Sequence, residues 1–379
     1  MELTEEQKML KDMTRDFCRQ EIAPIAEKID KSMEFPMDTI KQMGELGLMG
    51  VPFPEEFGGA GMNTVSYTIV VEELAKVCAS HSITCAAHTS LGANPIHLFG
   101  TDDQKKKYLA PLASGEVLGA FCLTEPSAGS DIRSMKTTAQ KVDGGFEING
   151  SKAFITNAGY ADTFIVFAIT EQSETDKKIS AFIVEKDTPG LKTGLKENKM
   201  GWRASDTRQV FFDKVFVPDE NLLGKLNEGF KQAVIILDGG RISVAALSLG
   251  IADAAFEESL KYSQERHQFG KPLSAFQTTQ IKIADMATQI EAARLLTYKA
   301  AGLKDEGKDY LKEASMAKLF ASEVATRTAS EAVQIHGGYG YSMEYPVERY
   351  FRDAKACEIG EGTSEIQRLL LARQLFKES

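Results

Sequence analysis

The residue that could most readily do chemistry is Glu361, which stands between two glycines in the stretch 360–362 near the C-terminus. Glycines on both sides let a ligand approach the backbone closely. We expect a helix to begin at Thr363 or Ser364, because Ser364 and Gln367 have the spacing of a capping box. A carboxylate at such a junction could act as a base on a bound substrate. A solvated loop acid would fit the same pattern.

A second stretch, Phe121–Asp131, combines hydroxyl side chains with a glycine and a proline. A loop of this composition can offer N–H and O–H donors to an anionic or heterocyclic ligand. An ordinary Ser/Gly turn would have the same composition, so the loop alone does not identify a site.

A third stretch, Asp238–Arg241, places Gly239 and Gly240 inside an otherwise good helix pattern. Two glycines in a helix interior cost roughly 2 kcal/mol in helix propensity. Such a cost indicates the close approach of a ligand, or equally of a neighbouring helix.

Two glycine-containing junctions between predicted helices complete the set, at 266–273 and at 334–340. Arginine and glutamine at these junctions could bind a pyrophosphate or a ribose. Neither junction contains GxGxxG after a strand, so neither is a Rossmann fingerprint or a P-loop. Ordinary solvated connections between helices remain the alternative.

The elements that must position these residues fall into three predicted domains. Residues 1–118 have helical periodicity, residues 119–226 carry strand signals, and residues 227–379 are helical again. In the first domain we expect a helix near 38–48 with Asp38 as its N-cap. In the third we expect four helices, at 230–264, 277–303, 314–335 and after Glu361, which together indicate a four-helix-bundle-like domain.

The middle domain is predicted to be a small antiparallel β-domain. Asn149-Gly150 between two apolar runs is typical of a tight hairpin turn. The stretch 187–201, with several glycines and a proline, is predicted to be mostly loop.

Composition narrows the class of protein. The formal net charge of −10 over 379 residues argues against a nucleic-acid partner and against an anionic membrane surface. Five scattered cysteines without a CxxC indicate reduced thiols, and the five histidines form no metal-spaced cluster. The acidic N-terminus is unlike a signal peptide, and no run of about 18 apolar residues is present. We therefore expect a cytoplasmic protein with no metal and no stable membrane insertion.

Taken together, the motifs resemble those of the acyl-CoA dehydrogenase family over the full length of the chain. They are TEPSAGSD, KAFITNAG, RHQFGKPL, QIHGGYGY and EGTSEIQR. The resemblance is to short-chain or butyryl-CoA dehydrogenases. It implies an N-terminal all-α domain, a central antiparallel β-barrel or sandwich, a C-terminal four-helix bundle, and FAD as the cofactor.

The resemblance also implies which residues bind. Those matching cofactor contacts are Phe121, Leu123, Thr124, Gly129, Ser130, Phe154, Ile155, Thr156, Arg266, Phe269, Gln277, Gln334, Ile335, His336, Gly337, Gly338, Thr363, Ser364 and Glu365. Those matching acyl-CoA contacts are Ser130, Asp238, Gly239, Gly240, Arg241, Gly360 and Gly362. Because part of the family's FAD site comes from the neighbouring subunit, a homotetramer built as a dimer of dimers is expected.

The resemblance assigns Glu361 as the base that removes the α-proton of an acyl-CoA, giving the trans-2-enoyl-CoA, with electrons passed to an electron-transferring flavoprotein. Some family members carry the base at the position of Gly240, where glycine cannot serve. Gly360 stands where many short-chain members have tyrosine, which indicates room for a branched, alicyclic or bulkier acyl group, unless Leu91 or His88 fills the space. Two alternatives stay open, an acyl-CoA oxidase-like flavoenzyme and a non-catalytic, DNA-associated family member.

Overall fold

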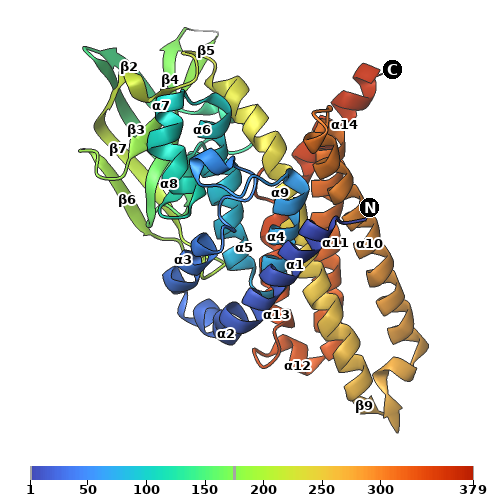
Figure 1. The fold of residues 1–379 in the computed structure, drawn as a ribbon. Helices are drawn as coiled ribbons and strands as arrows, with labels where there is room; N and C mark the ends of the chain where they lie inside the picture. Colours follow the sequence, from blue (N-terminus) through green and yellow to red (C-terminus); the bar gives the residue numbers. More distant parts are fainter. Residues whose placement is uncertain (1, 174–175, 379) are drawn as a thin grey trace.

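The computed structural model describes residues 2–173 and 176–378 and shows helices, then strands, then helices along the chain (Figure 1). The N-terminal part is helical, as predicted. Its α-helices are α1 Glu5–Phe17, α2 Ala23–Ser32, α3 Met37–Glu45, α4 Thr64–Val77, α5 Ala79–Ala86, α6 Asn94–Phe99, α7 Asp102–Gln104 and α8 Ala110–Ala113. Short π and 3-10 segments join them, at Cys18–Ile22, Glu55–Phe57, Ala87–Ala93 and Lys105–Leu109.

The predicted N-cap of the helix near residue 38 is wrong. α3 begins at Met37 with Pro36 as its N-cap, so Asp38 lies in the first turn. Its carboxylate there still faces the positive end of the helix dipole.

The middle of the chain forms a sheet of eight strands. The strands are β1 Leu118–Cys122, β2 Thr138–Val142, β3 Gly145–Thr156, β4 Ala161–Gln172, β5 Lys177–Glu185, β6 Leu191–Lys196, β7 Thr207–Pro218 and β8 Leu222–Leu223. Their order is β6-β7-β3-β2-β4-β5-β8, with β1 also paired to β4. Since β1 and β2 run parallel to β4 and the other pairs are antiparallel, the sheet is mixed, and the purely antiparallel prediction is wrong in that respect.

One local prediction in the sheet is also wrong, and one strand was missed. Asn149 and Gly150 do not form a hairpin turn, because β3 runs straight through them with a bulge against β7. A side chain at Gly150 would meet Thr137 at 2.5 Å, so glycine is required there by the residue just before β2 and not by a turn. The region 187–201 is mostly loop and turn, as predicted, but it also contains β6, an edge strand paired with β7, which the sequence did not predict.

The central strands β4 and β5 are buried on both faces. In β4, Phe164 and Val166 face one apolar cluster with Phe182, whereas the alternating residues Ile165 and Phe167 face a second cluster shared with the helices. This alternation follows from the two-residue period of a strand. That second face is covered by N-terminal segments, among them α6, α8 and Ala87–Ala93, and by the start of α9, Gly229–Glu265.

The C-terminal part is helical, with α9 Gly229–Glu265, α10 Gln277–Asp305, α11 Leu311–His336, α12 Gly338–Tyr341, α13 Val347–Cys357 and α14 Ser364–Glu378. A two-residue ribbon, β9 His267–Gln268 with β10 Lys271–Pro272, joins α9 to α10. The predicted long helices are confirmed, but α13 was missed. α9 is long and apolar enough to cross a membrane, yet 78% of its apolar window is buried inside this protein.

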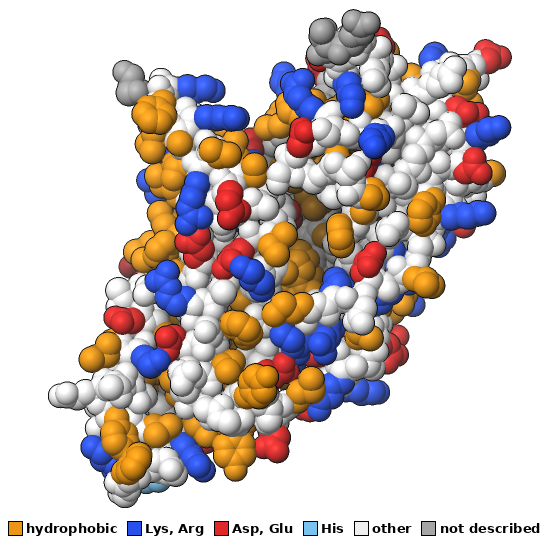
Figure 2. Space-filling view, turned by 180° about the vertical axis from the view of Figure 1, so that it is seen from behind, with side chains coloured by type: hydrophobic (Ala, Val, Ile, Leu, Met, Phe, Trp, Pro, Cys, Tyr) orange, Lys and Arg blue, Asp and Glu red, His pale blue; other side chains and the backbone are white. Residues whose placement is uncertain are grey.

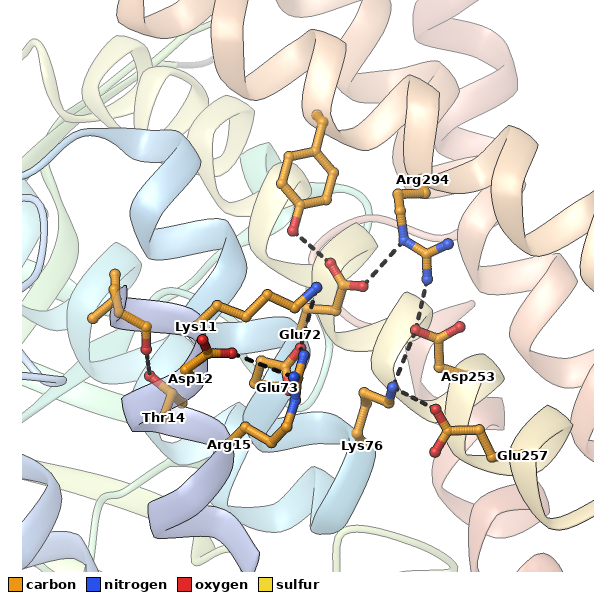
Figure 3. A network of polar contacts seen from close by, with 12 residues as sticks. Lys11, Asp12, Thr14, Arg15, Glu72, Glu73, Lys76, Asp253, Glu257 and Arg294 are labelled. Atoms are coloured by element: carbon orange, nitrogen blue, oxygen red, sulfur yellow. Dashed lines mark hydrogen bonds and ion pairs between the residues drawn. The ribbon is translucent and has the colours of Figure 1, made fainter. Parts of the chain in front are cut away.

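A polar network fixes the N-terminal helices against this bundle (Figure 3). Arg294 of α10 donates to Glu72 of α4 at 3.3 Å and to Asp253 of α9 at 2.6 Å. On the other side of α4, Arg15 of α1 donates to the buried Glu73 at 3.1 Å. The network therefore joins α1 and α4 to α9 and α10 of the bundle.

Candidate active site

Glu361 lies in a short turn between α13 and α14. Its backbone has a φ of 52°, and the next residue, Gly362, has a φ of 96°. A left-handed conformation at a non-glycine residue costs on the order of 1–3 kcal/mol and persists only where the surroundings impose it. Here a backbone bond from Ser364 N to the carbonyl of Glu358, at 2.9 Å, closes the turn.

The Glu361 carboxylate lies against α9 at Gly240. A Cβ added to Gly240 would come within 1.9 Å of the Glu361 Oε2 atom. Both carboxylate oxygens are buried and have no hydrogen-bond partner among the described residues. The neighbouring Gly239 is close to Lys304 Nζ, which a Cβ would approach to 3.1 Å. The glycine pair within α9 is therefore explained by side chains that occupy the space next to it.

Burial raises the pKa of Glu361 to about 7, and the positive charges of Lys318 and Arg241 act against that rise. A carboxylate with a pKa near neutrality is suited to act as a general base at physiological pH. The carboxylate is thus buried with a raised pKa, which excludes the alternative of a solvated loop acid.

The predicted start of α14 is confirmed, but its predicted cap is wrong. The hydroxyl of Thr363 accepts from Ile366 N at 3.3 Å, whereas the Ser364 hydroxyl has no partner within the described chain. Gln367 does not complete a capping box. Its side-chain amide donates to the carbonyl of Gly362 at 3.0 Å, because the turn folds back over α14.

A small cavity of about 30 Å³ lies on the other side of the glycine pair, between α4, the Ala87–Ala93 segment and α9. Its wall includes Gly239, Tyr67, Ser90 and Ser243. Burial raises the pKa of Tyr67, and the Glu361 charge adds to that rise, so this phenol lies near the base. Neither periodicity nor a motif had singled out Tyr67 or Ser243.

The space beside Gly360 is open, since a Cβ there would meet only the carbonyl of Ala356 at 3.5 Å. His88 does not fill it. Its ring bonds the carbonyl of Leu112 at 2.9 Å and accepts from Gly119 N at 3.1 Å, which makes it a satisfied core histidine.

The two predicted cofactor stretches of the sheet lie side by side. Ala153 N donates to the carbonyl of Thr124 at 2.9 Å, which joins the loop after β1 to the end of β3. A fully buried ion pair lies beneath them, with Lys152 Nζ 2.8 Å from Glu125 Oε1 and 3.1 Å from the carbonyl of Leu123. Phe154 is 68% exposed and has a φ of 56°, so this aromatic ring is presented at the surface.

The remaining members of these stretches have varied surroundings. Phe121 is half-buried and packs edge-on against Phe167, and Ile155 is buried in the sheet. Thr156 is half-buried, whereas Gly129 and Ser130 are exposed in the loop. The loop therefore presents polar groups at the surface, above the buried Lys152–Glu125 ion pair.

The two glycine-containing junctions form one groove of about 560 Å³ at the far end of the bundle. Arg266, Ile335, His336, Gly337 and Gly338 all lie on its wall, as do Tyr262 and Tyr339, which the sequence did not single out. Three other predicted residues, Phe269, Gln277 and Gln334, are exposed nearby and are not part of that wall.

His336 is held at the groove by aromatic stacking. Its ring stacks on Tyr262 with centroids 4.1 Å apart, and its Nδ1 bonds the carbonyl of Ala332 at 2.8 Å. The Nε2 atom has no partner within the described residues. The groove is thus lined by aromatic faces and by the exposed guanidinium of Arg266, a setting that fits a heterocycle and its phosphates.

The α9 residues predicted to contact acyl-CoA, Asp238–Arg241, include Gly240, next to which Glu361 lies. Arg241 is buried and pairs with Asp238 at 2.8 Å.

In the described ranges, no group of three or more His, Cys, Asp or Glu side chains could hold a metal ion. All five cysteines are buried and free, as predicted. The face shown in Figure 2 is hollowed near its centre, with apolar side chains at the bottom of the hollow.

Comparison with known protein families gives three matches in chain order. Residues 4–116 match the acyl-CoA dehydrogenase N-terminal domain, 120–215 the middle domain and 227–376 the C-terminal domain. A probable acyl-CoA dehydrogenase of Bacillus subtilis is 56% identical over 377 residues, covering 99% of both chains. The chain belongs to the acyl-CoA dehydrogenase family. The predicted family and three-part fold are confirmed, whereas the domain boundaries at 118/119 and 226/227 stay a prediction.

Other members of the acyl-CoA dehydrogenase family define its nearer relations. A short-chain specific acyl-CoA dehydrogenase of Clostridium acetobutylicum is 50% identical over 375 residues, covering 99% of both chains. The structure of butyryl-CoA dehydrogenase from Megasphaera elsdenii is 49% identical, with a TM-score of 0.97 and coverage of 99% of both chains.

Two further solved structures bear on cofactor and partner. An acyl-CoA dehydrogenase from Bacillus anthracis complexed with FAD is 38% identical, with a TM-score of 0.94, and this chain covers 68% of it. A chain from a study of the electron-transferring flavoprotein of Acidaminococcus fermentans and of electron bifurcation is 51% identical, with a TM-score of 0.97 and coverage of 99% of both chains.

Proposed function

We propose that this acyl-CoA dehydrogenase uses FAD to convert a short acyl-CoA thioester to its trans-2-enoyl-CoA, with Glu361 as the catalytic base. One observation supports the proposal above the others. The Glu361 carboxylate is buried, unpaired and pressed against Gly240, which leaves no room for a base at the alternative family position.

The residues around Glu361 are arranged to remove a weakly acidic proton. Because the carboxylate is desolvated, it is a stronger base than an exposed glutamate. Its own backbone N–H has no partner among the described residues, so it is free to donate to a thioester oxygen on which negative charge develops. The positive charges of Lys318 and Arg241 oppose protonation of the base before substrate arrives.

The β-domain and the bundle together provide the surfaces that FAD would contact. The outward polar loop at Thr124 and Ser130, with the exposed ring of Phe154, fits a flavin. The groove at Arg266 fits the dinucleotide part of an FAD held mainly by a second subunit, which favours the homotetramer. When bound, FAD supplies the acceptor for the β-hydride.

The acyl group we favour is short, and branching at its tail is compatible with the open space at Gly360. The short-chain and butyryl-CoA relatives support the short chain. We further propose that an electron-transferring flavoprotein in the cytoplasm receives the electrons, which the structural relative from the flavoprotein study supports.

The first prediction tests the base. In Glu361→Gln, FAD remains bound but anaerobic flavin bleaching by butyryl-CoA slows by roughly 10²- to 10⁴-fold, because no group accepts the α-proton. The matched control is Glu306→Gln, which neutralises an exposed glutamate at the end of α10 and leaves bleaching unchanged.

A panel of butyryl-, isovaleryl-, isobutyryl-, octanoyl- and cyclohexanecarboxyl-CoA then defines the acyl group. Bleaching of the wild-type flavin by none of these thioesters would contradict the proposed function. Wild-type rates in Glu361→Gln would contradict only the assignment of the base.

A further inference from the structure

Lys318 is a fully buried cation beside the Glu361 turn. It lies on α11, where its side chain is among the largest that are completely enclosed. Its Nζ atom donates to the carbonyl of Gly362 at 2.7 Å. No carboxylate lies within ion-pair distance of it in the part of the chain that the structure describes. A buried ammonium without a carboxylate partner is costly and calls for an explanation.

The carbonyl that Lys318 holds belongs to the strained turn. Two consecutive residues, Glu361 and Gly362, have positive φ angles of 52° and 96°. Gln367 of α14 holds the same carbonyl from another side at 3.0 Å and reaches the Glu361 carbonyl at 3.4 Å. The turn is thus held by two donors, Lys318 of α11 and Gln367 of α14, of which only Lys318 is charged.

The titratable groups that act on Lys318 come from several elements. They are Glu361 in the turn, Arg241 on α9, and Cys357 and Glu358 at the end of α13. Glu361 in turn is influenced by Lys318 and Arg241, and it acts on Tyr67 of α4. Burial lowers the pKa of Lys318 to about 8, and the nearby Glu361 and Glu358 carboxylates partly counter that effect.

A neutral donor would suffice to bind the Gly362 carbonyl, as the amide of Gln367 shows. Lys318 differs from Gln367 by its positive charge. Because the surroundings are of low polarity, this charge acts strongly on the buried carboxylate of Glu361. Arg241 is the other cation acting on Glu361, but it already pairs with Asp238 at 2.8 Å. Lys318 therefore provides the positive charge next to the base that is not neutralised by an ion pair.

We propose that Lys318 is a positioning residue for the reaction, which fixes the Glu361 turn through the Gly362 carbonyl and keeps Glu361 in its carboxylate form. The inference rests on the proposed function for its consequence in catalysis. The effect on the ionisation of Glu361 does not depend on which acyl-CoA is oxidised.

The test measures the ionisation of Glu361 in the substrate-free, FAD-loaded enzyme by infrared difference spectroscopy over pH. The protonated carboxyl band of Glu361 is identified by its loss in Glu361→Gln. In Lys318→Met the midpoint of that band moves to higher pH, on the order of one unit, because an opposite charge near the carboxylate has been removed. In Lys318→Arg the midpoint stays close to that of the wild type.

Gln367→Leu is the matched control. It removes one hydrogen bond from the same carbonyl without removing a charge, so it leaves the infrared midpoint unchanged while slowing flavin bleaching at every pH. In Lys318→Met the acid limb of bleaching against pH moves upward together with the infrared midpoint. Melting temperature and retained FAD show that each variant is folded.

The outcomes separate the two proposals. An unchanged infrared midpoint in folded Lys318→Met overturns the role of Lys318, whatever the activity. Lys318→Met could fail to fold. In that case Lys318→Arg decides, and an infrared midpoint that rises by about one unit although the positive charge is kept overturns the role of Lys318. A shifted midpoint with no bleaching of the wild-type flavin by any acyl-CoA supports the role of Lys318 and contradicts the proposed function.

Discussion

The Glu361 turn and the Arg266 groove lie in the same helical part of the chain but differ in how far they are enclosed and exposed to solvent. The turn is enclosed by α9, α11 and α14, and its carboxylate is buried without a partner. The groove is an open space of about 560 Å³, and Arg266 on its wall is exposed. Beside it Phe269 is 93% exposed.

The difference indicates what each region needs. The turn is complete within one chain, because every group that shapes it comes from helices of that chain. The groove presents the exposed guanidinium of Arg266 and the half-exposed ring of Tyr339, which fits a site completed by a second subunit and its cofactor. Changes at the turn should therefore alter chemistry within one chain, whereas changes at the groove should alter binding and assembly.

The largest effect is expected where the turn is tightest. Gly240→Ala places a methyl group where Glu361 Oε2 lies, at 1.9 Å, so the carboxylate must move away. A displacement of about 1 Å from the productive geometry costs roughly 10²-fold in rate, and we expect a loss of 10²- to 10³-fold in flavin reduction. Stopped-flow bleaching measures it.

Gly302→Ala is the control for Gly240→Ala, since it makes the same change in a long helix with no atom within 4 Å of the added Cβ. This variant should retain its rate and gain up to about 1 kcal/mol of stability from helix propensity. Equal rates in the two variants would contradict the close packing of Glu361 on α9.

The second effect is on stability and depends on pH. Glu361 has a pKa of about 7 in the folded chain against an ordinary value of 4.5, so the folded state holds the proton more tightly. The free energy of unfolding therefore falls as pH rises from 4.5 to 7, by up to about 3 kcal/mol, and levels off above that range. Glu361→Gln removes this cost.

Denaturant unfolding measures the difference. Glu361→Gln should be more stable than wild type by up to about 3 kcal/mol near pH 8, and by less than about 1 kcal/mol near pH 5. A difference between the two proteins that does not change with pH would contradict the burial of an unpaired carboxylate. Among the described residues, the wall of the groove holds no buried carboxylate without a partner, so the difference in stability between Arg266→Ala and wild type should not change in this way with pH.

The sequence was sufficient for the fold but not for the tuning of the site. Long periodic segments such as α9 and α10 were predictable, because apolar spacing is a local property of the chain. The Asn149-Gly150 turn was predicted wrongly for the opposite reason. A glycine required by Thr137, the residue before β2, looks the same in sequence as a glycine required by a hairpin.

At the site, Glu361 and the glycine pair of α9 could be singled out because their residue types are unusual for their positions. Lys318 could not, since it stands in an ordinary helical pattern and only the packing of α11 against the turn reveals it. Tyr67 escaped notice for the same reason. Contacts between segments far apart in the chain decide the ionisation of the base, and periodicity carries no information about them.

The smallest effect is expected at the groove. Arg266→Ala removes a guanidinium that can bind phosphate, so the Kd for FAD should rise by about tenfold. Because Arg266 is remote from the Glu361 turn, the rate of flavin reduction at saturating FAD should match that of the wild type. Fluorescence titration with FAD measures the affinity, and Arg19→Ala, at an exposed arginine of the N-terminal helices, is the control.

Dilution adds a second test of the groove. If a neighbouring subunit completes the site, FAD should dissociate from Arg266→Ala at a higher protein concentration than from wild type, in step with the loss of the oligomer seen by sedimentation. A rate loss that saturating FAD does not restore would place Arg266 in the chemistry and remove the distinction between the two regions. An affinity that is unchanged by both substitution and dilution would mean that the groove does not bind the cofactor, since the exposed guanidinium of Arg266 would then make no contact with FAD.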